Sequence, residues 1–216
     1  MIRDVEEIAA SMLKLFAVLS LVDAGYSSSN FKTFLYGEEI KLADISKTNE
    51  EIKNDFVNHI NSHWTRKYIT ELLIDYQKND IVYLNEYLFA KENNIEFNIV
   101  GDIDIEHIMP QSGKNIDLIR EDAGITDEAL FNNYINKIGN KILLEYNINR
   151  TIGNEWFRTK VSTKISNKTG YVDSIYPIAQ TLVDRYKNNS KPYWTKSDID
   201  DATKEACDRI TDFIFS

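Results

Sequence analysis

Apolar residues recur at three- and four-residue steps along most of this chain, and that spacing is typical of amphipathic helices. The segment 2–24 shows the pattern, with Ile8, Met12, Leu15 and Leu19 on one face. Only 8 Gly and 3 Pro occur in 216 residues, so few positions favour tight turns. The expected helices cover residues 2–24, 31–35, 48–60, 68–76, 80–88, 127–137, 149–161, 175–187 and 197–215. The fold class is therefore predicted to be mainly α.

One stretch breaks the helical spacing. Residues 95–108 alternate apolar and polar side chains at period two, which predicts a β-strand with a bulge or turn at Gly101. A second short strand is predicted at 141–145, directly before the next helix. We expect a helical bundle over residues 1–93, which could serve as a linker or docking region. A second domain over residues 94–216 is expected to hold a small strand–loop–strand–helix insert.

The composition indicates an intracellular protein. A single cysteine, Cys207, cannot form a disulfide within the chain, which suits a reducing compartment. The apolar run 12–22 contains Lys14 and follows acidic residues where a signal peptide has basic ones. No stretch reaches the roughly 18 apolar residues of a membrane-spanning helix. We therefore expect a cytoplasmic protein without a membrane partner.

Charge is distributed unevenly along the chain. The net charge is −9, which by itself disfavours nucleic acid as a partner. Between Lys137 and Lys168, however, five Lys and two Arg stand against two Glu, a local charge of +5 that leaves −14 for the rest. This basic window (residues 137–168) predicts contacts to phosphates, and the alternative is a solvated helix face. The candidate nucleic-acid-binding residues are Lys141, Arg150, Arg158, Lys160 and Lys164.

The segment Gly101–Gln111 (GDIDIEHIMPQ) carries groups that the hydrolysis of a phosphodiester requires. A base must accept a proton from water, and a cation must take up charge on the leaving oxygen. His107 can act as the base near neutral pH, and the carboxylate of Glu106 with an amide from a later helix suits Mg²⁺ or Mn²⁺. Taken alone, acids at period two are more typical of a solvated strand face. Strict alternation also puts Glu106 and His107 on opposite faces, unless the strand ends there, as Pro110 indicates.

Three blocks of the sequence together resemble a known family. They are Ile105–Gln111 (IEHIMPQ), Ile138–Leu144 (IGNKILL) and Asn149–Asn154 (NRTIGN), with Phe157 and Lys160 behind the last block and Trp194 ahead of the final helix. In this order they resemble the carboxy-terminal nuclease domain of the GmrSD-type modification-dependent restriction enzymes, a branch of the HNH (His-Me finger) nucleases. The resemblance extends over roughly residues 80–215. It implies a ββα-metal insert within a helical bundle, and a DNA endonuclease that acts in bacterial defence against foreign or modified DNA.

The resemblance also implies a role for each matching residue. Glu106 matches a metal ligand and His107 matches the base that activates water. Asn140 matches the asparagine that steadies the loop and orients the histidine. Asn149 matches the second metal ligand, where many members have histidine, so the asparagine favours Mg²⁺ (or Mn²⁺) over Zn²⁺. Lys141 stands where an apolar residue is common, and the long gap between His107 and Asn140 implies an insertion.

Partners and competing functions follow from the same comparison. The family usually carries an amino-terminal nucleotide-hydrolysing sensor domain, and no GxxxxGK[ST] loop occurs in this sequence. The expected partners are therefore DNA and a separate sensor domain or subunit. The alternative function is a non-catalytic nucleic-acid-binding or protein-interaction module on an HNH-like scaffold. Side chains expected to pack or face water, with no role in chemistry, are His59, His63, Trp156, Trp194 and Cys207.

Overall fold

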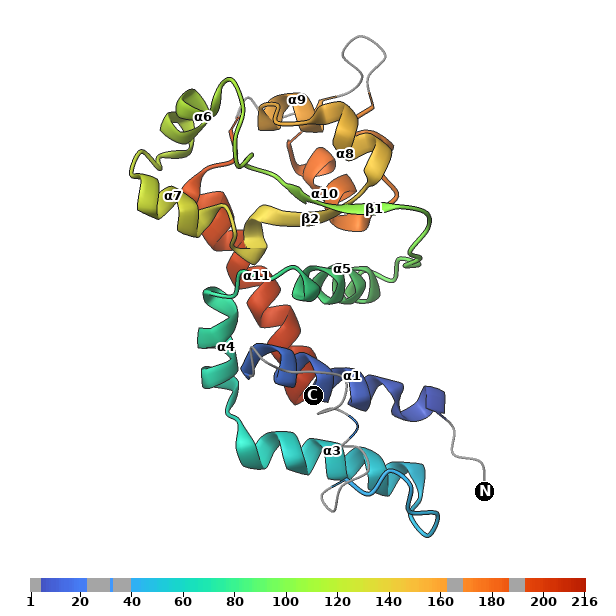
Figure 1. The fold of residues 1–216 in the computed structure, drawn as a ribbon. Helices are drawn as coiled ribbons and strands as arrows, with labels where there is room; N and C mark the ends of the chain where they lie inside the picture. The colour runs from blue at the N-terminus through green and yellow to red at the C-terminus, as the bar shows by residue number, and fades with distance from the viewer. Residues whose placement is uncertain (1–4, 23–31, 33–39, 163–168, 187–192) are drawn as a thin grey trace. The chain divides into compact units, whose positions relative to one another are not determined.

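A computed structural model of the chain describes residues 5–22, 32, 40–162, 169–186 and 193–216. The described residues are mostly helical and contain one small two-stranded sheet, as Figure 1 shows. They form two compact units: residues 1–73 with 210–216 make up the first, and residues 74–209 the second. Residues 74–93, which the sequence pattern placed in the helical bundle, lie in the second unit.

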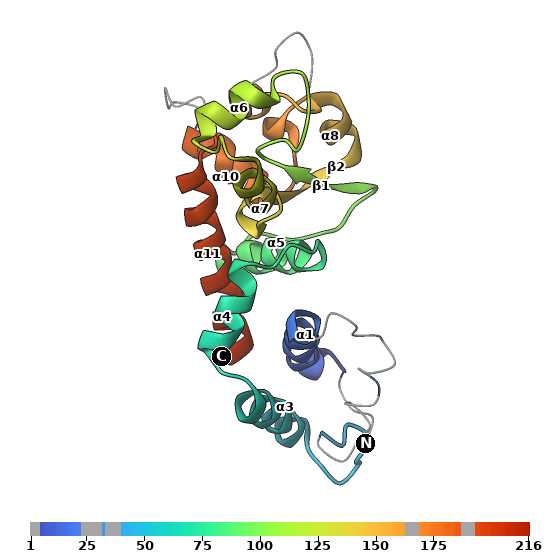
Figure 2. The same ribbon diagram turned by 60° about the vertical axis from the view of Figure 1, so that its left-hand side comes forward.

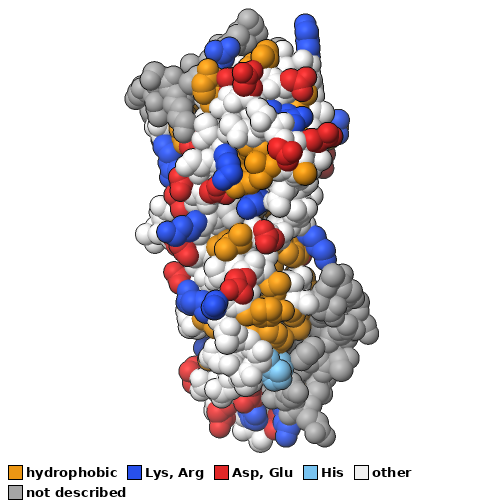
Figure 3. Space-filling view, turned by 90° about the vertical axis from the view of Figure 1, so that its left-hand side faces the viewer, with side chains coloured by type: hydrophobic (Ala, Val, Ile, Leu, Met, Phe, Trp, Pro, Cys, Tyr) orange, Lys and Arg blue, Asp and Glu red, His pale blue; other side chains and the backbone are white. Residues whose placement is uncertain are grey.

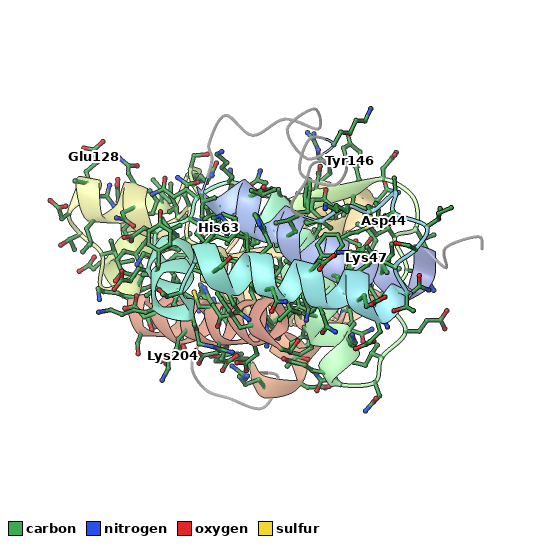
Figure 4. The ribbon with its side chains drawn as sticks, turned by 90° about the horizontal axis from the view of Figure 1, so that it is seen from below. Asp44, Lys47, His63, Glu128, Tyr146 and Lys204 are labelled. Carbon is green, nitrogen blue, oxygen red and sulfur yellow. The ribbon has the colours of Figure 1, made fainter. Side chains whose placement is uncertain are left out.

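The first unit is built from α1 (Val5–Val22), α3 (Asn49–His63) and most of α4 (Arg66–Ile74), and α1 packs against α3. The start of α3 is a capping box, because Thr48 and Glu51 bond to each other's backbone N–H. Asp44 and Lys47 lie in the turns before α3, and His63 lies at the end of that helix (Figure 4). The helix predicted at 31–35 and the loop before it lie outside the described residues, apart from Lys32.

The second unit holds the remaining elements, and it contains the site. In chain order they are α5 (Asp80–Glu92), β1 (Ile103–His107), α6 (Ile116–Ala123), α7 (Glu128–Tyr134), the 3-10 turn η1 (Ile138–Asn140), β2 (Lys141–Glu145), α8 (Tyr146–Ile152), α9 (Phe157–Val161), the 3-10 turn η2 (Tyr171–Asp173), α10 (Pro177–Tyr186) and α11 (Lys196–Phe215), whose last residues belong to the first unit. The insertion expected between His107 and Asn140 is thus folded as α6 and α7.

The sheet is antiparallel, and its register pairs Ile103 with Glu145 and His107 with Lys141. It lies between α5 on one face and α8 on the other (Figures 1 and 2). Because side chains alternate along a strand, Ile142 and Leu144 of β2 face the main core together with α8. Helix α8 follows β2 directly and contacts both strands.

The first strand is shorter than its sequence pattern predicted, and the prediction of a strand at 95–100, before Gly101, was wrong. Only 103–107 pair with β2, which is itself five residues long. Alternating residues form a strand only where a neighbouring strand accepts their hydrogen bonds, and 95–100 have no such neighbour among the described residues. Ile99 and Val100 are instead 58% and 59% exposed. Gly101, at φ 73°, makes the expected turn.

Two helix boundaries in the structure differ from those expected from the local sequence, at the start of α5 and at the end of α8. Asp127 caps α7 as its sequence context suggests, by accepting a hydrogen bond from Leu130 N. Asp80, in contrast, is the first residue of α5, and Asn79 holds the cap position without a side-chain hydrogen bond to the helix N-terminus. The single helix expected at 149–161 is two helices, because Gly153 adopts φ 51° and ends α8.

The main core of the second unit covers the α8 face of the sheet. It combines aliphatic residues with an aromatic group in which Phe157, Tyr186 and Trp194 contact one another. Trp194 and Cys207 are buried and Trp156 is partly buried against this core, as expected. Among the described helices, none is both long and apolar enough to cross a membrane.

Candidate functional site

The end of β1 positions the two central residues of the site on opposite faces of the sheet. In the pairing register Glu106 lies opposite Ile142, whereas His107 lies opposite Lys141. Glu106 and Asp104 therefore share the face that α8 covers, and His107 shares the other face with Lys141. The strand ends at His107, so the backbone is free to turn immediately after it.

Glu106 is almost fully buried, at 5% exposed, and its Oε1 is already engaged by two donors. Lys160 Nζ donates to it at 2.5 Å, and the hydroxyl of Tyr171 donates to it at 2.9 Å. Burial, and then the neighbouring carboxylate, raise the pKa of Tyr171 well above its ordinary value, so the hydroxyl remains a donor. Within the described ranges, Oε2 is the carboxylate oxygen left to take another partner.

Lys160 is 0% exposed, so the expectation that it contacts phosphate was wrong. Its ammonium makes three hydrogen bonds, to Glu106 Oε1, to His107 O at 2.8 Å and to Ile108 O at 3.2 Å. An ammonium has three protons, so none is left for a nucleic acid. The side chain of Lys160 is part of the support beneath the strand end.

Lys141 was also expected to contact nucleic acid, and burial excludes that role too. The residue is 2% exposed, and its Nζ donates to Gln77 O at 2.5 Å and to Asn79 Oδ1 at 3.0 Å. Burial lowers the pKa of Lys141, while Asp80 opposes that shift. Lys141 thus ties β2 to the residues that precede α5.

His107 carries an uncharged imidazole at neutral pH. Burial, followed by the charges of Lys141 and Lys160, lowers its pKa from 6.5 to about 4, and a side-chain hydrogen bond with Asn136 opposes the shift. The side-chain amide of Gln111 lies 2.8 Å from Nε2 and can donate to it. A ring nitrogen that accepts a hydrogen bond can also accept a proton, which is the property a general base needs.

Asn140 holds the loop that follows the histidine. It is 0% exposed, and its Nδ2 donates to Met109 O and Ile135 O, both at 3.0 Å. Its Oδ1 accepts from Met109 N at 2.7 Å, and its backbone carbonyl accepts from Ile108 N at 3.0 Å. These contacts give Asn140 a positioning role, because its side chain is saturated and has no access to solvent.

Asn149, on α8, contacts Asp104 and not Glu106. Its Nδ2 lies 3.1 Å from Asp104 Oδ2, and Arg150 Nε lies 3.8 Å from the same oxygen. Asp104 and Asn149 are both partly exposed. From the sequence, Asp104 was interpreted as a solvated strand residue. Its i, i+2 spacing from Glu106 was nevertheless a signal that both side chains lie on the same face of the strand, which in the structure is the α8 face.

Two of the candidate basic residues are exposed. Arg150 has a side chain 69% exposed and lies over the ring of Tyr146 at 4.8 Å (Tyr146 is labelled in Figure 4). Arg158 is exposed and lies over Trp156 at 5.4 Å. Lys164 lies outside the described residues. Basic side chains are interspersed with acidic ones on the face in Figure 3, so that face carries charges of both signs.

The oxygen-bearing side chains on the α8 face are of the types that hard divalent ions bind. Carboxylates from Asp104 and Glu106 and the amide of Asn149 come from adjacent elements, and Mg²⁺ and Mn²⁺ prefer such ligands. Among the described residues, no three His, Cys, Asp or Glu side chains are grouped so that they could hold a metal by themselves. Such a site would therefore need the amide and water or substrate oxygens as well.

Residues 46–208 match the family model described as GmrSD restriction endonucleases, C-terminal domain. The chain belongs to this family. The matched range contains all the site residues named above, and the resemblance noted in the sequence is confirmed. No curated protein and no solved structure matches the chain. This GmrSD C-terminal domain is thus related to restriction endonucleases. At its strand end, Lys160 bonds to the carbonyls of His107 and Ile108, and Asn140 bonds to the backbone of Ile108 and Met109.

Proposed function

We propose that this chain is a metal-dependent DNA endonuclease of a bacterial defence system against foreign or modified DNA. The observation that carries the proposal is the place of His107 at the end of β1, directly after the buried Glu106, in a chain of the GmrSD C-terminal domain family. The strand–strand–helix order of β1, β2 and α8 supports an HNH-type arrangement.

His107 acts as the general base in this proposal. A water molecule that attacks phosphorus transfers a proton to the unprotonated ring nitrogen, and the bond from phosphorus to the leaving sugar oxygen breaks. Gln111 occupies Nε2 at 2.8 Å, so its amide must give way to that water or orient it. Asn140 acts indirectly, by holding the backbone of the two residues after the base.

Glu106 and Asn149 are the proposed ligands of one Mg²⁺ or Mn²⁺, and Asp104 adds a third oxygen-bearing side chain beside Asn149. When bound, such an ion stabilises negative charge on the phosphate and on the leaving oxygen. Glu106 can contribute through Oε2, since Oε1 is held by Lys160 and Tyr171. Asn149 must then release its hydrogen bond to Asp104 or turn its amide oxygen towards the ion.

Arg150 and Arg158 are the proposed phosphate contacts. Both are exposed on consecutive helices, and each lies against an aromatic ring that limits its motion. Contacts to phosphates position DNA without reading its sequence. Selectivity for modified DNA is therefore assigned, as part of the proposal, to a sensor domain or subunit that acts together with this one.

Cleavage of supercoiled plasmid in the presence of Mg²⁺ or Mn²⁺ tests the proposal. His107→Ala should abolish nicking and linearisation, while His63→Ala, an exposed histidine on α3, should cleave at the wild-type rate. Circular dichroism of both variants checks that the fold is retained. Wild-type cleavage by a folded His107→Ala variant would refute the assignment of the base. DNA binding without cleavage by the wild-type chain would favour the non-catalytic module.

A further inference from the structure

Lys160 is the most deeply buried charge in the described part of the site. The residue is 0% exposed, and a buried ammonium is stable only when every proton has an acceptor. All three acceptors belong to three consecutive residues at the end of β1, namely Glu106, His107 and Ile108. Among these contacts, two are to backbone carbonyls, so the lysine holds the main chain of the strand end as well as one carboxylate.

We propose that Lys160 is a positioning residue for cleavage, which fixes the main chain that carries His107 and orients the carboxylate of Glu106. The inference rests on the function proposed above. It replaces the role in phosphate binding that the basic window suggested.

Asn140 holds the same segment through other backbone atoms. Asn140 bonds to Ile108 N and to both backbone groups of Met109, while Lys160 bonds to the carbonyls of His107 and Ile108. Residues 107–109 are therefore held by η1 and by α9 together. Misplacing a catalytic group by about 1 Å can cost about 100-fold in rate, so loss of one support is expected to reduce turnover strongly.

The carboxylate of Glu106 is oriented by the same lysine. Lys160 and Tyr171 both donate to Oε1, and this leaves Oε2 for another partner. Without the ammonium, the buried carboxylate would keep its bond to Tyr171 but lose its counter-charge. The lysine thus supports both the base and the proposed ligand.

Lys160→Met is the test, because methionine removes the ammonium and keeps an unbranched side chain. Arg158→Met is the matched control: it removes an exposed charge two residues away on the same helix. Three experiments are made on each variant: exchange of the Ile108 and Met109 amides with solvent, plasmid cleavage for kcat and KM, and DNA affinity as a function of salt.

For Lys160→Met we expect exchange of the Ile108 and Met109 amides at least about tenfold faster relative to amides of α10, and kcat lower by about 100-fold per folded molecule. KM, DNA affinity and its salt dependence should stay within about twofold of the wild-type values. Arg158→Met should show the reverse pattern, with weaker, less salt-dependent DNA binding and unchanged amide exchange.

Three results would overturn the proposal. The first is unchanged exchange of the Ile108 and Met109 amides in Lys160→Met. The second is weaker DNA binding by this variant with kcat retained, which would indicate that Lys160 contacts phosphate. The third is faster exchange throughout the second unit with kcat per folded molecule retained, which would indicate a purely structural role. If Lys160→Met does not fold, exchange is measured in Lys160→Met with Glu106→Gln, which removes both buried charges. Amide exchange needs no cleavage, so it separates failure of this inference from failure of the proposed nuclease activity.

Discussion

Replacing Glu86 with glutamine is expected to stabilise the second unit at neutral and alkaline pH. Glu86 lies on α5 behind the sheet and is 0% exposed. Its Oε1 accepts from Ile178 N at 2.8 Å, which ties α5 to α10, whereas Oε2 is buried without a hydrogen-bond partner among the described residues. A buried carboxylate with one bare oxygen is costly when charged.

The expected size follows from the pKa of Glu86. Burial, with a smaller contribution from Glu145, raises this pKa from 4.5 to about 7, although backbone N–H groups and Arg209 oppose the shift. Below pH 4.5 the carboxyl group is protonated in both states. As pH rises from 4.5 through 7 the unfolded chain releases the proton first, so stability falls, by about 3 kcal/mol in total. Glutamine cannot ionise, and Glu86→Gln should lack this loss.

Urea unfolding of wild type and Glu86→Gln, at several pH values from 4.5 to about 8, measures the effect. A Trp64→Phe background leaves Trp156 and Trp194 as the tryptophans, both in the same unit as Glu86. Glu121→Gln is the control, because it makes the same change at an exposed position on α6. The advantage of Glu86→Gln over wild type should grow by about 3 kcal/mol across the range. A difference that stays constant with pH would refute the reasoning.

Three further predictions concern the site and its support. Excess EDTA should stop cleavage, and Asn149→Ala should raise the Mn²⁺ concentration for half-maximal cleavage about tenfold or more; cleavage that persists in chelator would exclude the metal. Replacing Arg150 and Arg158 together by glutamine should flatten the slope of log affinity against log salt by about 2, and an unchanged slope would show that neither meets phosphate. Gly139→Ala should lower the free energy of unfolding by about 1–3 kcal/mol in urea titrations, because its Cβ would clash with Ile199 O and Thr203 of α11. A variant as stable as the wild type would show that α11 shifts to make room for the methyl group.

Much of the fold was predictable because it depends on neighbours in the chain. The capping box at Thr48, the cap at Asp127 and the turn at Gly101 are set by residues within about four positions. Helical spacing predicted α10 and α11 nearly to their ends, and the apolar run at 141–145 is β2. The extent of β1 was not predictable in this way, since a strand needs a partner and the partner lies more than 30 residues away.

For the site, the sequence by itself determined which groups are present and in what order: the Glu106–His107 pair, Asn140 and Asn149, within a family of restriction endonucleases. Only the tertiary structure decided which side chains face one another. The sequence does not distinguish a lysine that is exposed to water from one whose ammonium is buried. Lys160 is of the second kind, and its three acceptors lie 52 to 54 residues away in the chain. Burial and hydrogen-bond partners are set by chain segments that meet only on folding, and for that reason the basic window proved to contain supports for the strand end as well as exposed charges.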